Sequence, residues 1–125
     1  MKRISLVLQI ILAALLLSSA GCNKGSAKVD ATKSLEQSFQ AASPEVKQAI
    51  QAINACLRAG NYVEATSSMA TVVSSDSLTS AQKQAIGLLL QQINQAVAAN
   101  PNLDSAEFFK KRQALFDQVY HAPGA

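Results

Sequence analysis

Apolar side chains recur at helical spacing from about residue 30 to residue 120, and no segment alternates apolar and polar residues over the length of a strand. Residues three and four positions apart share one face of a helix, so each such stretch predicts an amphipathic helix. Alanine, glutamine, leucine, lysine and glutamate occupy most of the remaining positions, and all of them favour helix. The pattern predicts an all-α domain over residues 30–121, built as a four- to five-helix antiparallel bundle.

Turn and capping residues divide this region into five segments. Residues 30–42 form a weak first helix, in which residues 34–37 are either a capping box or part of the helix interior. Ser43 as N-cap and Pro44 at the first helical position begin a second helix. Gly60 ends that helix, because glycine tolerates the left-handed conformation.

Three more helices follow in the same manner. Asn61 can cap the third, and Thr79-Ser80-Ala81-Gln82 has the form of a capping box for the fourth. Asn100 stops the fourth, because the residue before a proline avoids the helical conformation. Asp104-Ser105-Ala106-Glu107 has the form of another capping box, before the last helix. The expected core positions are Leu35, Phe39 and Ala42; Val46, Ala49, Ile50, Ile53, Cys56 and Leu57; Tyr62, Ala65, Met69, Val72 and Val73; Ile86, Leu89, Leu90, Ile93 and Val97; and Phe108, Phe109, Leu115, Phe116, Val119 and Tyr120.

Two of these helices carry apolar residues beyond one narrow stripe. In the last helix the apolar positions spread over an arc of about 140°. In the fourth, Leu88 falls roughly opposite Ile86 and Leu90. Either this helix packs on two sides or Leu88 is an exposed contact point for a partner.

The first 21 residues have the three parts of a secretory signal peptide: a basic start, a short apolar run and a patch of small residues. An uncleaved membrane anchor is the alternative. Residues 4–20, the apolar stretch at its longest, reach only the lower limit of about 17 residues for crossing a bilayer. Cleavage is therefore preferred. Loss of Lys2 and Arg3 lowers the formal net charge of +3 by two charges and removes any argument for nucleic acid from global charge.

The residues at the end of this leader sharpen the interpretation. Ser19-Ala20-Gly21-Cys22 resembles the lipobox of bacterial lipoproteins, although the family usually has Leu at the position of Ser19. The resemblance implies cleavage between Gly21 and Cys22 and acylation of Cys22, palmitate being typical. Ordinary cleavage with a free Cys22 thiol is the alternative. Asn23 lacks the Asp that resembles an inner-membrane retention signal in many Gram-negative bacteria. The resemblance therefore implies an outer-membrane lipoprotein that faces the periplasm.

Residues 22–29 then form a lipidated N-terminus and a small, polar tether, and residues 122–125 a frayed tail. Fully extended, residues 23–29 reach at most about 25 Å. We therefore expect the helical domain to stay close to the bilayer surface.

The join between the second and third helices carries a second resemblance. Ala59-Gly60-Asn61-Tyr62-Val63-Glu64-Ala65, followed by Met69 and Val72, is similar to the turn and second helix of a tetratricopeptide repeat. The match covers about one repeat, residues 46–77. It departs from the family at Ile53, where a small residue is usual, and at Ser77, where Pro is usual. The resemblance implies a groove for peptides or protein partners. Stable arrays need three or more repeats, so a single helical hairpin is the other interpretation.

Few residues suggest chemistry. Cys56 lies on an apolar stripe and is interpreted as a small buried hydrophobe, with an intermolecular disulfide as the alternative. His121 is the only imidazole, so neither a metal site nor a nucleophilic triad is expected. Lys110, Lys111 and Arg112 form the only basic run. They either cover apolar surface with their stems or belong to a basic, aromatic surface patch that docks on lipid headgroups or an acidic partner.

The sequence thus predicts a lipid-anchored envelope protein that binds and does not catalyse, with no cofactor and no small-molecule substrate. Its partners would be the bilayer, through acylated Cys22, and an envelope protein held by an adaptor domain. Leu88, Lys110 and Lys111 are the candidate contacts. A structural protein that associates with itself is the second hypothesis.

Overall fold

The computed structural model describes residues 28–75 and 77–121, which contain five α-helices, one short 3-10 helix and no strand. The α-helices are α2 (Thr32–Ser38), α3 (Pro44–Ala59), α4 (Tyr62–Ser75), α5 (Ser80–Ala99) and α6 (Ala106–Tyr120); η1 (Pro101–Leu103) lies between the last two. The predicted all-α bundle is confirmed. The leader, the proposed cleavage and lipidation site at Gly21 and Cys22, and the C-terminal tail lie outside the described residues.

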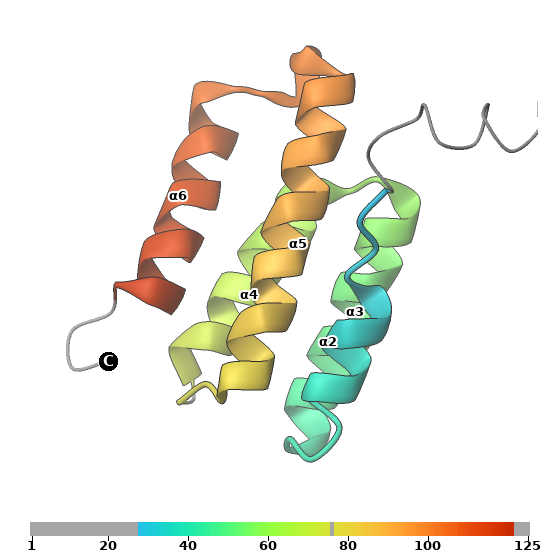
Figure 1. The fold of residues 1–125 in the computed structure, drawn as a ribbon, viewed down its shortest axis with the longest axis vertical. Helices are drawn as coiled ribbons and strands as arrows, with labels where there is room; N and C mark the ends of the chain where they lie inside the picture. The colour runs from blue at the N-terminus through green and yellow to red at the C-terminus, as the bar shows by residue number, and fades with distance from the viewer. Residues whose placement is uncertain (1–27, 76, 122–125) are drawn as a thin grey trace, which may run out of the picture.

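Successive helices run antiparallel, with α5 in front of α4, α2 and α3 to one side and α6 to the other (Figure 1). The main contacts join α2 to α3, α3 to α4, α4 to α6, α6 to α5 and α5 back to α2. The five helices therefore close a ring around one core. The buried apolar side chains of that core are Ala31, Leu35, Phe39, Ile50, Ile53, Leu57, Ala65, Met69, Val72, Val73, Ala85, Ile86, Leu89, Leu90, Ile93, Phe108, Leu115 and Val119.

The caps of α3 and α5 are those that the sequence predicts. The Ser43 hydroxyl accepts the Val46 N–H, and Gly60 ends α3 with a φ of 79°. Thr79 and Gln82 form the reciprocal capping box of α5. Side-chain caps of this kind satisfy N–H groups that have no partner inside the helix.

The start of α6 differs from the prediction by one residue. Ser105, not Asp104, is the N-cap, and its hydroxyl accepts the Phe108 N–H. The chain completes the η1 turn first, and the Asp104 carboxylate pairs with Arg112 instead. The predicted first helix is likewise shorter than expected, because turns follow Ser38 before α3 begins.

The chain enters the bundle at the end where α5 finishes and α6 starts. Here the Val29 N–H donates to the Gln95 side chain over 2.8 Å, and the Ala31 N–H donates to the Gln92 side chain over 2.9 Å. Asp30 then accepts from both the backbone and the hydroxyl of Thr32. These contacts fasten the entering segment to α5 before the first helix begins.

Candidate interaction surface

The apolar arc of α6 is divided between the core and the solvent. Phe108, Leu115 and Val119 are buried, whereas the side chains in the next sector of the helix are exposed. Phe109 is 53% exposed, Phe116 45% and Tyr120 39%. We call these three residues the aromatic stripe. Large aromatic side chains exposed in a contiguous row are typical of interaction sites.

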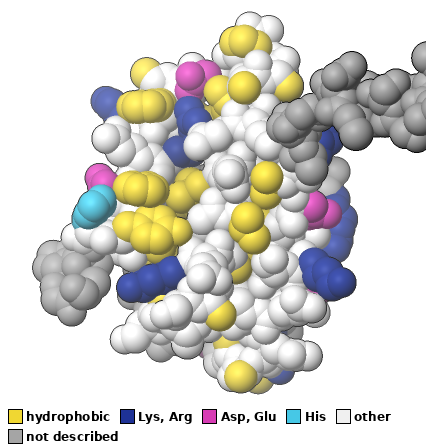
Figure 2. All heavy atoms as spheres, viewed as in Figure 1, with side chains coloured by type: hydrophobic (Ala, Val, Ile, Leu, Met, Phe, Trp, Pro, Cys, Tyr) yellow, Lys and Arg dark blue, Asp and Glu magenta, His cyan; other side chains and the backbone are white. Residues whose placement is uncertain are grey.

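The stripe is held in a defined conformation by its neighbours. The rings of Phe116 and Tyr120 lie 4.9 Å apart, and that of His121 lies 5.6 Å from Phe116. The Tyr120 hydroxyl donates to the Lys83 carbonyl over 2.8 Å, which ties the end of α6 to α5. Figure 2 shows hydrophobic side chains gathered over α6 beside the imidazole. The surface is thus largely preorganised, which lowers the entropic cost of binding.

Arg112 anchors the other side of the stripe. Its guanidinium donates to Asn94 of α5 over 2.7 Å and pairs with Asp104, and it lies over the rings of Phe108 and Phe109 at 5.0 and 5.7 Å. Cation–π contacts of this kind favour an Arg between two rings. Of the two interpretations of Arg112, the structure supports the one in which its stem packs against aromatic side chains and its head finds a carboxylate.

A groove of about 330 Å³ runs between α5 and α6 beside the stripe. It is lined by Leu90, Asn94, Phe109, Arg112, Gln113, Phe116 and Asp117. Its walls combine apolar rings with amide and charged groups. This composition is suited to a protein side chain or helix, and it brings together no nucleophile and base.

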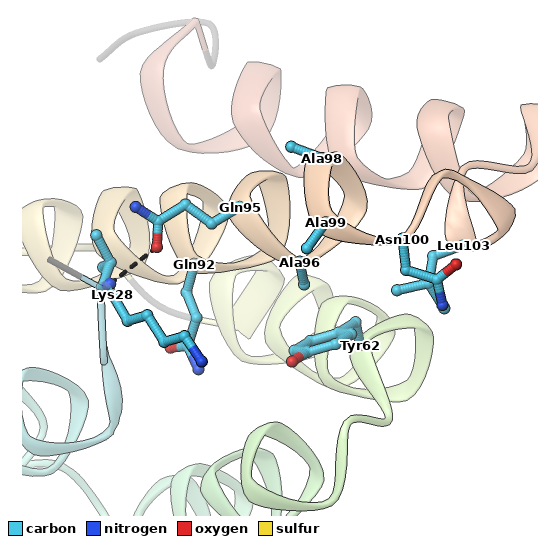
Figure 3. A pocket seen from close by; sticks show the side chains of 10 residues that line it. Lys28, Tyr62, Gln92, Gln95, Ala96, Ala98, Ala99, Asn100 and Leu103 are labelled. Carbon is cyan, nitrogen blue, oxygen red and sulfur yellow. Dashed lines mark hydrogen bonds between the residues drawn. The ribbon is translucent and has the colours of Figure 1, made fainter. Parts of the chain in front are cut away.

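A larger hollow of about 670 Å³ opens where the chain enters (Figure 3). Tyr62 of α4 and the small side chains Ala96 and Ala99 of α5 form its apolar part. Its polar part includes Gln92 and Gln95, which hold the entering backbone. The entering residues Lys28 and Val29 therefore form one wall of the hollow.

The residues singled out in the sequence lie in different places. Leu88 is half-buried and packs against the core at the α2 side of α5, so α5 is packed on two sides. Lys110 is exposed, and Lys111 is half-buried and contacts Ser67 and Glu107. Cys56 is a half-buried free thiol.

The structure therefore brings only some of the candidate contact residues together on one surface. Lys110 and Lys111 share α6 with the aromatic stripe, while Leu88 lies on the opposite side of α5. Sequence reasoning offered a basic, aromatic patch at Lys110, Lys111 and Arg112 as an alternative, but it did not name the residues of the stripe, because it assigned all six apolar residues of the last helix to one arc. The spacing of Phe109, Gln113, Phe116 and Tyr120, by four, three and four residues, was the available signal.

No protein-family model, curated protein or solved structure matches the chain. None of the helices within residues 28–75 and 77–121 is long and apolar enough to span a bilayer. In the same residues, no group of three or more His, Cys, Asp or Glu side chains is arranged to hold a metal ion.

Proposed function

We propose that the protein is a bacterial envelope lipoprotein, anchored through acylated Cys22, whose helical domain binds another protein and does not catalyse a reaction. The observation that carries the binding role is the aromatic stripe, which is exposed, preorganised and bordered by a groove. Buried apolar contact is the main source of affinity between proteins, and aromatic side chains dominate it. The lipobox-like sequence before Cys22 supports the anchor.

The expected docking surface differs from the groove that the tetratricopeptide-like turn implies. The α3–α4 hairpin supplies core residues such as Ala65 and Met69, and its exposed large apolar side chain is Val63. The aromatic stripe of α6 exposes three large side chains in a row. We therefore place the adaptor contact on α6, with Lys110 at its edge.

Crosslinking in living cells of the native producer tests the adaptor function. A tagged full-length chain is compared with Cys22→Ser and with Phe109→Ala/Phe116→Ala, and captured proteins are identified by mass spectrometry. We expect one envelope protein to be captured by the wild type at least fivefold more than by either variant. Equal capture by the stripe variant would contradict the docking surface, and retention of Cys22→Ser in the membrane fraction would contradict the lipid anchor.

Self-association is the second candidate function. It is favoured by one observation, the heptad-like spacing of the exposed positions on α6.

A further inference from the structure

We propose that the occupant of the aromatic stripe is the α6 helix of a second copy of this chain, paired in parallel within the same membrane. The inference rests on the proposed lipid anchor and develops the second candidate function, self-association, for which it names the paired surface. It joins three observations: the spacing of the exposed side chains, the charges beside them, and the end at which the chain enters the bundle.

The spacing is that of a two-stranded coiled coil. Phe109, Gln113, Phe116 and Tyr120 follow one another by four, three and four residues, and all four are exposed. Such positions form the seam of a coiled coil, in which each side chain packs between residues of the partner helix. The 15 residues of α6 supply two heptads. Gln113 is the single polar member of the seam, and a polar seam residue fixes the register.

The charges beside the seam are complementary between copies. In a parallel coiled coil, the residue that directly precedes a seam position such as Gln113 lies close to the residue five positions later in the sequence of the partner helix. Arg112 therefore lies on the flank that faces Asp117 of the second copy, although its guanidinium is already paired with Asp104 in its own copy and only 12% of its side chain is exposed. Asp117 is exposed and makes no ion pair within residues 28–75 and 77–121. In an antiparallel pair, Lys110 would face Asp117, so charge alone leaves both orientations favourable.

The position of the tether decides the orientation. Lys28 lies beside Gln92 and Gln95 in the C-terminal half of α5, the half nearer to the start of α6 (Figure 3). From Cys22 to Lys28 the chain spans at most about 20 Å, whereas the 20 residues of α5 extend about 30 Å. For copies whose helices stand along the membrane normal, an antiparallel pair would place one entry point at the far end of the dimer, beyond the reach of its tether. Two copies anchored upright in one membrane therefore pair in parallel, with the symmetry axis along the membrane normal.

The size of the contact also fits anchored copies. A contact between one helix of each copy buries less surface than the roughly 1,200–2,000 Å² that a standard stable interface buries in total. Such a contact is weak between freely diffusing molecules. Confinement to one membrane raises the effective concentration and compensates for the small area. The inference is thus that pairing depends on the anchor.

Disulfide crosslinking of the full-length chain tests the pairing. Gln113→Cys is introduced in a Cys56→Ser background, which also serves as the parent control. In a parallel pair the two Gln113 positions face each other, so oxidation of the membranes joins them. Gln51→Cys, on the exposed face of α3, is the matched control. We expect at least five times more disulfide dimer from Gln113→Cys than from Gln51→Cys.

Two further substitutions separate the seam from the rest of the helix. Phe116→Lys places a charge in the seam, whereas Ala114→Lys places the same charge on an exposed position outside it. The first should lower the Gln113→Cys dimer at least fivefold, and the second should leave it within twofold. Circular dichroism of the two variants should be the same, because both side chains are exposed.

The outcomes distinguish this inference from the proposed function. If the wild type is in the membrane and Gln113→Cys crosslinks no better than Gln51→Cys, the pairing is wrong and the anchor stands. A disulfide to a different protein would overturn the pairing and support the adaptor. Equal dimer yield after Cys22→Ser, with that variant in the soluble fraction, would overturn the dependence on the anchor. A wild type absent from membranes would overturn the proposed function itself.

Discussion

At the scale of single residues, the Asp30 side chain caps the start of α2, which has no side-chain cap from its N-cap residue. Ala31, the N-cap residue, makes no side-chain cap, whereas the Asp30 carboxylate accepts from the hydroxyl and backbone N–H of Thr32. The hydrogen bond from the Thr32 hydroxyl, then that from its backbone, holds the pKa of Asp30 below its usual value of 3.8. The Arg58 charge acts in the same direction and less strongly.

Asp30→Ala should therefore lower the free energy of unfolding by about 0.5–1 kcal/mol at pH 7, the range of an exposed helix cap. A carboxylate with a depressed pKa stabilises the fold above the pKa of the unfolded chain and loses that effect as the pH falls through the folded value. The difference in the free energy of unfolding between the wild type and the variant should be constant at neutral pH and should decrease below about pH 3.8. Urea denaturation across this range measures it, and a gap that widened in acid would contradict the assignment.

Gly87 of α5 keeps space for the tyrosine of the aromatic stripe. A Cβ added there would lie 2.7 Å from the Tyr120 hydroxyl oxygen and 3.9 Å from the ring carbon that bears it. Alanine in a helix interior is more favourable than glycine by about 0.5–1 kcal/mol. The hydroxyl that blocks this gain also makes the hydrogen bond to the Lys83 carbonyl.

Gly87→Ala alone should consequently change stability by less than about 0.5 kcal/mol, because the helix gain offsets a lost hydrogen bond. In a Tyr120→Phe background the clash disappears, and the same substitution should stabilise by about 0.5–1 kcal/mol. A double-mutant cycle by urea denaturation tests this coupling. The same effect in both backgrounds would show that the hydroxyl does not oppose the alanine.

At the scale of elements, α6 has two apolar faces with different purposes. Leu115 is fully buried, whereas its neighbour Phe116 is 45% exposed. Leu115→Ala should lower the free energy of unfolding by about 2–5 kcal/mol, as for other buried leucines. Phe116→Ala should cost less than about 1 kcal/mol in the unanchored chain, although it removes more atoms. Thermal or urea unfolding of both variants compares the two faces, and equal costs would mean that Phe116 belongs to the core.

The elements themselves were largely predictable from local sequence. Ser43, Gly60 and the Thr79–Gln82 capping box act within one turn of the chain, so their effect needs no knowledge of the packing. The start of α6 depended on a distant group, because Asp104 is drawn to Arg112 eight residues away. The buried Asn54, which donates to the Thr32 carbonyl and to Glu36, was missed for the same reason. Its partners come from another helix.

At the scale of the whole molecule, the hydrophobic periodicity predicts the all-α class, but it does not predict which helix faces pack against each other. An arc of about 140° on α6 could belong wholly to the core or be divided. The division arises because α6 packs mainly against α4 and α5, which leaves one sector uncovered. Leu88 is the opposite case, since α2 covers the face that looked exposed. Of the candidate surface, Lys110 and Lys111 were predicted, whereas the aromatic stripe depends on the arrangement of the helices.

The attachment of the entering chain to α5 has a mechanical consequence. The side chains of Gln95 and Gln92 accept the N–H groups of Val29 and Ala31, ahead of the first helical turn. A pulling force applied to the chain at Lys28 therefore acts on these two hydrogen bonds before it acts on the packing of Leu35. Because both acceptors belong to the longest helix, the load passes to α5 and its neighbours and does not peel α2 away first. The first resistance to a pull on the N-terminal segment therefore comes from α5, the helix at the middle of the bundle, and not from α2.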